Sequence, residues 1–110
     1  MISLSTHVLD TARGAPAAHV AITLANAAGT QLFAGATDAD GRCKAFPGLD
    51  PGRYRLTFTV GSYFTGQGAM LTDPPFLDVI VIDFGLSGAD GHYHVPLLVS
   101  PYGYSTYRGS

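Results

Sequence analysis

The chain has 110 residues, of which 46% are hydrophobic and 13% charged, and its formal net charge is −2. This length leaves room for one domain with one core, which we expect to span residues 1–110. The six Lys and Arg residues are scattered and form no basic stripe, so nucleic acid is not an expected partner. No apolar run approaches the length of a membrane span, and we expect no membrane association. With so few charges, part of the apolar surface is expected to be covered by another subunit.

The cysteine content and the first residues bear on the cellular compartment. A single cysteine, Cys43, excludes an internal disulfide bond, so no oxidising compartment is implied. The chain begins directly in a strand pattern without the features of a secretory signal, and we expect a cytoplasmic protein. Cys43 lies between Arg42 and Lys44, and cationic neighbours can activate a thiol as a nucleophile. Because no catalytic motif surrounds it, we interpret Cys43 as a small residue inside a strand.

The first run of the chain alternates between two faces with period two. Ile2, Leu4, Thr6 and Val8 share one face, which we expect to point into the core. His7 shares the opposite face with two serines. The pattern therefore predicts a strand whose histidine points away from the core.

Strand patterns and turn signals recur along the rest of the chain. We expect further strands at residues 20–24, 31–37, 54–60, 76–84 and 92–99. The segment Asp38–Gly41 is a strong turn signal and makes Arg42 the first residue after the turn. The only helix candidate is 62–71, which two internal glycines weaken. Short strands with almost no helix indicate an all-β sandwich.

The run 76–84 is unusual because Val79–Ile82 place apolar side chains on both faces. A sandwich strand normally needs only one apolar face. The second face is a candidate subunit contact.

The end of the chain is rich in aromatic and hydroxyl groups, whereas chain ends are usually poorly ordered. Tyr102–Ser110 follows the strand pattern at 92–99 through a turn at Ser100–Gly103, where proline and glycine suit a type I turn. We expect the terminus to be the returning arm of a hairpin and part of a site or an interface.

Several polar groups are predicted to lie outside the core. His92 and His94 stand two residues apart on a strand and project from the same face. With His7, Arg42 and the terminal carboxylate they form either a polar site or a set of solvated surface residues. A zinc site made by the three histidines is a further possibility. His19 has no evident partner and is expected at the surface.

The order of these motifs resembles a known family. The matching segments are Leu4–Asp10, Arg13–Pro16, Thr37–Arg42, Gly52–Tyr54, Tyr63–Phe64 and His92–Ser110. Together they resemble transthyretin and its relatives over essentially the whole chain. The terminal Tyr107–Ser110 is the signature of the 5-hydroxyisourate hydrolases and is absent from hormone-carrying transthyretins. Transthyretins also differ at the positions of His7, Arg42 and His94.

The resemblance implies a transthyretin-like (prealbumin-like) β-sandwich of two antiparallel sheets with one short helix near residues 62–70. It also implies a homotetramer, built as a dimer of dimers, with the sites in the channel at the dimer–dimer interface. The implied reaction is hydrolysis of 5-hydroxyisourate to 2-oxo-4-hydroxy-4-carboxy-5-ureidoimidazoline in urate degradation. No cofactor or metal is expected.

The resemblance also implies roles for individual residues. The implied catalytic residues are His7, Arg42, His94 and Ser110, and the implied substrate contacts are His7, Arg42, Tyr107 and Arg108. One or both of His7 and His94 would be the general base, and the choice stays open. Arg42 would bind substrate oxygens and developing negative charge. Two other functions stay open: a small-ligand binding protein of the transthyretin type, and a zinc hydrolase that uses His7, His92 and His94.

Overall fold

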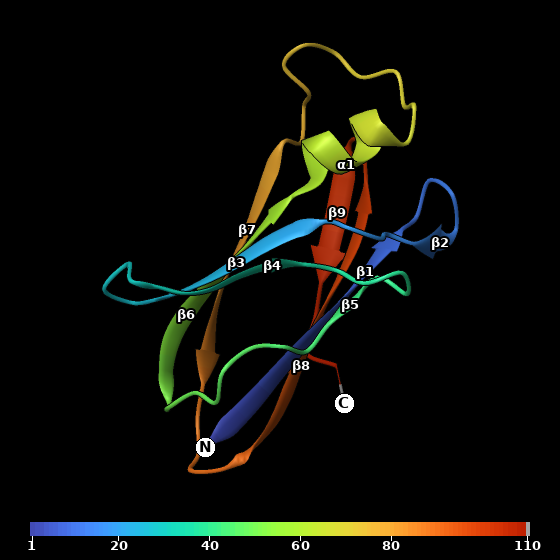
Figure 1. The fold of residues 1–110 in the computed structure, drawn as a ribbon. Coiled ribbons are helices and arrows are strands. Elements are labelled where there is room, and N and C mark those ends of the chain that lie inside the picture. Colours follow the sequence, from blue (N-terminus) through green and yellow to red (C-terminus); the bar gives the residue numbers. More distant parts are fainter. Residues whose placement is uncertain (110) are drawn as a thin grey trace.

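The computed structural model describes residues 1–109, and Ser110 lies outside the described residues. Two sheets pack face to face (Figure 1). The first has five strands in the order β2-β1-β8-β9, with β5 also paired to β1, and the second has four in the order β4-β3-β6-β7. The elements are β1 (Ile2–Asp10), β2 (Ala15–Pro16), β3 (Ala21–Asn26), β4 (Gln31–Ala36), β5 (Arg42–Cys43), β6 (Gly52–Thr59), α1 (Val60–Gly66), β7 (Val79–Leu86), β8 (Gly91–Ser100) and β9 (Gly103–Thr106). The predicted all-β sandwich is confirmed.

The first sheet departs in one respect from the expected antiparallel pattern. Strands β1 and β8 run parallel, from the pair Ile2–Gly91 to the pair Asp10–Val99. Parallel neighbours require a long crossover, and here the whole second sheet lies between the two strands in the sequence. The predicted C-terminal hairpin is confirmed, because β9 returns antiparallel along β8.

The second sheet is antiparallel throughout. Its last strand, β7, starts at Val79 and not at Phe76 as predicted, and it extends to Leu86. Phe76 and Leu77 lie in a bend that follows Pro74 and Pro75, and proline has no N–H to donate to a ladder. The apolar pattern of residues 76–84 therefore predicts a start of the strand that is too early.

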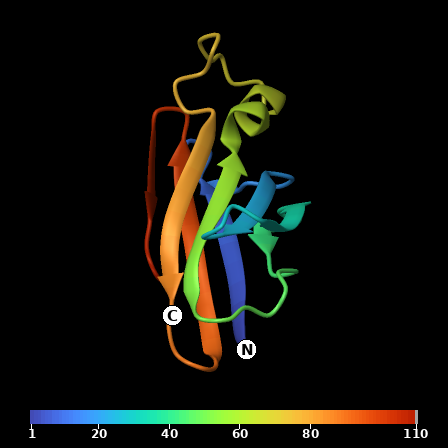
Figure 2. The ribbon, with the colours of Figure 1, turned by 90° about the vertical axis from the view of Figure 1, so that its left-hand side faces the viewer.

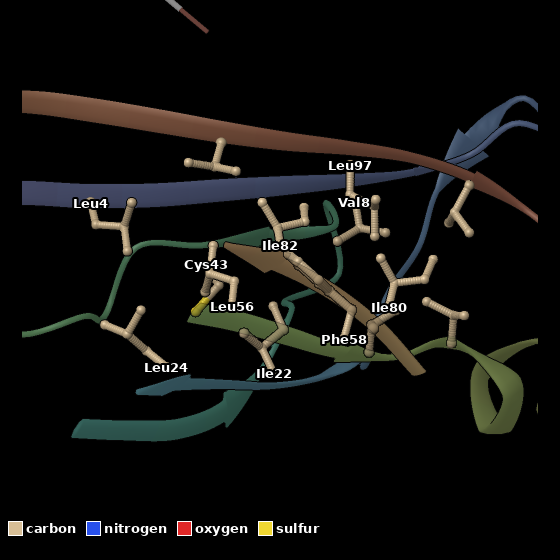
Figure 3. Packing of buried hydrophobic residues seen from close by; sticks show 14 of the residues in the cluster. Leu4, Val8, Ile22, Leu24, Cys43, Leu56, Phe58, Ile80, Ile82 and Leu97 are labelled. Atoms are coloured by element: carbon tan, nitrogen blue, oxygen red, sulfur yellow. The ribbon is translucent and has the colours of Figure 1, made fainter. Parts of the chain in front are cut away.

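The core fills the space between the two sheets (Figure 3). Alternate residues of β1 point into it as predicted, and Leu97 of β8 packs beside Val8. Thr6 is also buried, and its hydroxyl donates a hydrogen bond to the carbonyl of Val95. The core side of β1 and β8 is closed by packing, with Thr6 and Asp10 as its buried polar residues. The serines and histidines of the two strands lie on the opposite, outer face of the first sheet.

The expected helix is present but begins and ends earlier than residues 62–70. It covers Val60–Gly66 and follows directly on β6 at one end of the sandwich (Figure 2). Val60, Tyr63 and Phe64 are buried, so packing of this face starts the helix before Ser62. Gly68 follows with a φ of +80°, a conformation that favours glycine and does not continue a helix. Within residues 1–109, no helix has the length and apolar character needed to cross a membrane.

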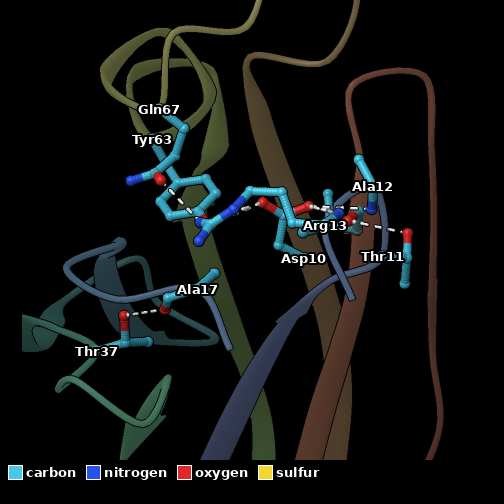
Figure 4. A network of polar contacts seen from close by, with 9 residues as sticks. Asp10, Thr11, Ala12, Arg13, Ala17, Thr37, Tyr63 and Gln67 are labelled. Atoms are coloured by element: carbon cyan, nitrogen blue, oxygen red, sulfur yellow. Dashed lines mark hydrogen bonds and ion pairs between the residues drawn. The ribbon is translucent and has the colours of Figure 1, made fainter. Parts of the chain in front are cut away.

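A buried carboxylate ties the end of β1 to the helix (Figure 4). Asp10 is fully buried and accepts hydrogen bonds from the backbone of Ala12 and Arg13 and from the hydroxyl of Tyr63, at 2.9 Å. Burial, and then the bond to Asp10, raise the pKa of Tyr63. The guanidinium of Arg13 donates a 2.7 Å hydrogen bond to the side-chain carbonyl oxygen of Gln67. This network holds one end of the strand that carries His7.

Candidate functional site

The outer face of the first sheet brings residues from opposite ends of the chain together. In the β1–β8 register, Ser3 lies opposite His92 and Ser5 lies opposite His94. His7, two residues further along β1, lies opposite Arg42 of β5. Residues two apart on a strand share a face, so three of the predicted catalytic residues belong to one surface.

The turn before β5 determines where Arg42 emerges. The Asp38 carboxylate accepts hydrogen bonds from the backbone N–H groups of Asp40 and Arg42, at 2.9 and 3.0 Å. The bond from Arg42 is the largest cause of the lowered pKa of Asp38. Gly41 has a φ of +74°, and a Cβ there would lie 2.6 Å from the carbonyl oxygen of Val8. The sequence Asp-Ala-Asp-Gly therefore allows the turn to pack closely against β1, and this places Arg42 in register with that strand.

The ring of His7 is held by the same turn. Its Nε2 lies 3.0 Å from the carbonyl oxygen of Asp40. A carbonyl oxygen only accepts, so Nε2 carries the hydrogen of this bond. In the neutral ring, Nδ1 of His7 is therefore left as an acceptor.

His94 is held by a serine that the sequence argument did not select as a site residue. The hydroxyl of Ser5 lies 2.8 Å from Nδ1 of His94 and 2.9 Å from Nε2 of His92. The hydroxyl of Ser3 lies 2.6 Å from Nδ1 of His92. The signal in the sequence that could have identified these serines is the period-two pattern, which places Ser3 and Ser5 on the same face of β1 as His7. Only the pairing of β1 with β8 brings them to the other histidines.

The environment of His94 favours its neutral form. Burial is the largest cause of its lowered pKa, followed by the charges of His7, His92 and Arg42. A lowered pKa keeps the imidazole unprotonated to lower pH than is ordinary for histidine. His94 is therefore available in the unprotonated form that a general base requires.

The C-terminal segment returns along β8 as far as His94. After β9, the N–H of Gly109 donates a 2.7 Å hydrogen bond to the carbonyl of His94. A Cβ at position 109 would lie 2.6 Å from Cδ2 of the His94 ring, closer than carbon atoms normally approach. The glycine of the terminal signature is therefore required by contact with a predicted catalytic residue. The predicted site residue Ser110 lies outside the described residues.

Tyr107 and Arg108 are not brought to this face within the chain. The Arg108 guanidinium carbon lies 4.0 Å from the centre of the Tyr93 ring, a cation–π contact. Tyr93 alternates with His92 and His94 and so belongs to the other side of β8. Tyr107, which is 60% exposed, lines a cavity of about 230 Å³ with Arg108 and Tyr93.

The remaining candidates from the sequence are placed as follows. Cys43 is a buried residue of β5, and burial raises the pKa of its thiol, which disfavours the nucleophilic thiolate. His19 is exposed, as predicted. Among residues 1–109, no group of three or more His, Cys, Asp or Glu side chains could hold a metal ion. The three histidines considered from the sequence as zinc ligands, His7, His92 and His94, do not form such a group among these residues.

The two-sheet sandwich and its outer histidine face define a transthyretin-like protein. The chain belongs to the HIUase/Transthyretin family, whose model matches residues 4–109. The family resemblance stated from the sequence is confirmed.

Individual relatives support the same assignment. The chain is 54% identical over 115 residues to a 5-hydroxyisourate hydrolase from Caulobacter vibrioides, covering 100% of both chains. The solved structure of the Klebsiella pneumoniae 5-hydroxyisourate hydrolase matches with a TM-score of 0.87 and 38% identity, also over 100% of both chains. A crystal structure of (S)-allantoin synthase matches 99% of this chain with a TM-score of 0.91 and 41% identity. This chain spans 44% of the length of that synthase chain.

Proposed function

We infer that this protein hydrolyses 5-hydroxyisourate to 2-oxo-4-hydroxy-4-carboxy-5-ureidoimidazoline. The observation that carries the inference is the convergence of His7, His94 and Arg42 on one face of the first sheet. Two proton acceptors and one permanent cation are the groups that a water attack on a cyclic amide needs. The full-length relatives named 5-hydroxyisourate hydrolase support the choice of substrate.

The proposed reaction needs no covalent enzyme intermediate. A water molecule attacks a carbonyl carbon of the cyclic amide while one of the two imidazoles takes its proton. The carbon–nitrogen bond then breaks, and the imidazolium returns the proton to the leaving nitrogen. Arg42 stabilises the oxyanion of the tetrahedral intermediate with its planar set of donors. Arg42 also donates hydrogen bonds to the substrate oxygens, and His7 binds the substrate by accepting a hydrogen bond at Nδ1.

The C-terminal signature is proposed to complete this site. Ser110 would orient a histidine or the water through its hydroxyl or its terminal carboxylate. Tyr107 does not reach the histidine face of its own chain, so it would bind the substrate ring in a site shared with another subunit. The Gly109–His94 backbone bond supports this role, since it carries the end of the chain to the histidine face. Arg108, also proposed from the sequence as a substrate contact, packs on Tyr93, which supports a structural role for it.

We propose a homotetramer, a dimer of dimers, with the sites at the dimer–dimer interface. Within residues 1–109, β7 is an edge strand that pairs with β6 alone, and it exposes Val79 and Val81, at 48% and 42%. This apolar second face supports the subunit contact expected from the sequence. A neighbouring subunit over the histidine face would close the site to bulk water. Sedimentation of the purified protein tests the assembly, and a monomer at micromolar concentration would contradict it.

We also propose a cytoplasmic location, which an unpaired, buried thiol at Cys43 supports. Fractionation of cells that produce the protein tests the proposal. Recovery outside the cytoplasmic fraction would contradict it.

The activity is tested by generating 5-hydroxyisourate from urate with urate oxidase and following its ultraviolet decay. Chelator-treated protein is expected to accelerate the decay. Absence of acceleration by assembled protein would favour the ligand-binding function. Activity that returns only with added zinc would favour the metal hydrolase. His7→Ala is expected to reduce turnover, with His19→Asn as a matched control at an exposed histidine.

A further inference from the structure

Four polar side chains form an unbroken row across β1 and β8. In order they are Ser3, His92, Ser5 and His94, with successive separations of 2.6, 2.9 and 2.8 Å between hydroxyl oxygens and ring nitrogens. We name the first three the serine–histidine relay. Each hydroxyl and each neutral imidazole supplies one hydrogen. The direction of one bond in the row therefore determines the direction of the others.

The first end of the row has a defined direction. The hydroxyl of Ser3 lies 3.3 Å from the carbonyl oxygen of Gly91, which only accepts, so Ser3 donates there. Ser3 must then accept from His92, which places the ring hydrogen of His92 on Nδ1. Nε2 of the neutral ring of His92 is consequently an acceptor.

The direction of these hydrogen bonds continues along the row to His94. Nε2 of His92 accepts the hydrogen of the Ser5 hydroxyl. Ser5 has no second hydrogen, so its 2.8 Å contact with His94 requires a hydrogen on Nδ1 of His94. Nε2 of His94 is then left with a lone pair.

The reverse direction makes fewer hydrogen bonds. If Ser3 donated to His92, the contact between Ser3 and the Gly91 carbonyl would contain no hydrogen. The forward direction satisfies that contact and all three contacts within the row. A nearby Arg42 charge also favours a neutral His94.

We propose that the serine–histidine relay holds His94 in its Nδ1–H tautomer and leaves Nε2 as the acceptor for the proton of the attacking water. Ser3, His92 and Ser5 are then positioning residues that act through His94. The proposal rests on the proposed hydrolysis and deepens it, because it assigns the general base to His94.

The tautomer can be measured without any substitution that alters the relay. Long-range proton–nitrogen correlation spectra of the assembled protein, labelled with ¹⁵N and recorded above the histidine titration range, distinguish the two neutral tautomers. Signals of His94 are assigned by their loss in His94→Gln. The expected result is a protonated Nδ1 and a bare Nε2 in both His94 and His92. A His94 ring protonated on Nε2 would overturn the proposal.

Substitutions of Ser5 then test the effect on the reaction. Ser5→Ala is expected to lower kcat by about tenfold, the scale of one lost hydrogen bond, with little change in KM. It is also expected to shift His94 towards the other tautomer. Ser5→Thr keeps the hydroxyl in a strand-compatible residue and is expected to restore both values. Ser62→Ala, at an exposed serine of α1, is the control. Wild-type kcat and an unchanged tautomer in a folded Ser5→Ala protein would overturn the proposal.

The serine–histidine relay and the proposed hydrolysis can be disproved separately. If the tautomers are as expected but the wild-type protein does not hydrolyse 5-hydroxyisourate, the proposed function is wrong and the relay stands. If hydrolysis is present but His94 carries its hydrogen on Nε2, the relay is wrong and the function stands.

Discussion

An alanine at position 109 would place its Cβ 2.6 Å from Cδ2 of His94 and 3.2 Å from Cβ and Cγ of the same residue. Carbon atoms in contact are normally at least about 3.5 Å apart. The closest pair would therefore have to separate by roughly 0.9 Å. Either the ring of His94 turns away from Ser5 or the C-terminal segment moves off β8.

Both responses displace a group of the proposed site by about 1 Å, and a misplacement of that size can lower the rate about 100-fold. The effect on folding should be much smaller. Gly109 lies beyond the last strand and makes one backbone bond to His94. Losing that bond costs about 1 kcal/mol, or roughly 4–8 °C in Tm for a domain of this size.

The assay compares kcat/KM for 5-hydroxyisourate and Tm between the wild-type protein and Gly109→Ala. Gly103→Ala is the matched control in the same hairpin, because the nearest atom to its added Cβ is the Ser100 hydroxyl at 3.8 Å, an ordinary contact. It is expected to retain wild-type kcat/KM. A folded Gly109→Ala protein with wild-type kcat/KM would refute the reasoning from this contact.

Three further predictions concern the site and the network at the end of β1. Because the pKa of His94 is lowered, protonation removes the general base only at lower pH. The midpoint of the acid limb of the kcat/KM pH profile should therefore lie below the ordinary histidine value of about 6.5. A midpoint at or above that value would contradict this prediction. Arg42→Ala should lower kcat by about 100-fold without changing thermal unfolding. It should also move the acid limb of the pH profile to higher pH, because the charge of Arg42 contributes to the lowered pKa of His94. An unchanged kcat would show that Arg42 does not stabilise the oxyanion. Tyr63→Phe should destabilise the fold by about 1–3 kcal/mol in denaturant titrations, because the fully buried Asp10 loses a donor. Turnover of folded Tyr63→Phe protein at 25 °C should stay at the wild-type level, and a large loss would place this network in the site.

The features that the sequence predicted correctly have local causes. Period-two alternation placed the core side of β1 and sent His7 to the other face, because successive side chains of a strand point in opposite directions. The segment Asp38–Gly41 predicted the turn before Arg42, because an aspartate side chain and a glycine with positive φ close it within a few residues. The proline and glycine after β8 predicted the C-terminal hairpin for a similar reason.

Local patterns failed where packing determined the boundary. The helix begins at Val60 and not at Ser62, because buried side chains stabilise its first turn against the sandwich. Strand β7 begins at Val79, where pairing with β6 starts, although the apolar pattern starts at Phe76.

The assembly of the site was decided only by the tertiary structure. Ser5 and His94 are 89 residues apart in the sequence, and a hydrogen bond joins them because β1 pairs with β8 in parallel and in one register. A shift of that register by one residue would turn the histidines of β8 away from the serines of β1. The contact between Gly109 and His94 likewise depends on the path of the chain after β9. The sequence by itself determined which side chains leave the core, since that follows from each strand's own alternation, whereas their meeting depends on pairing between distant strands.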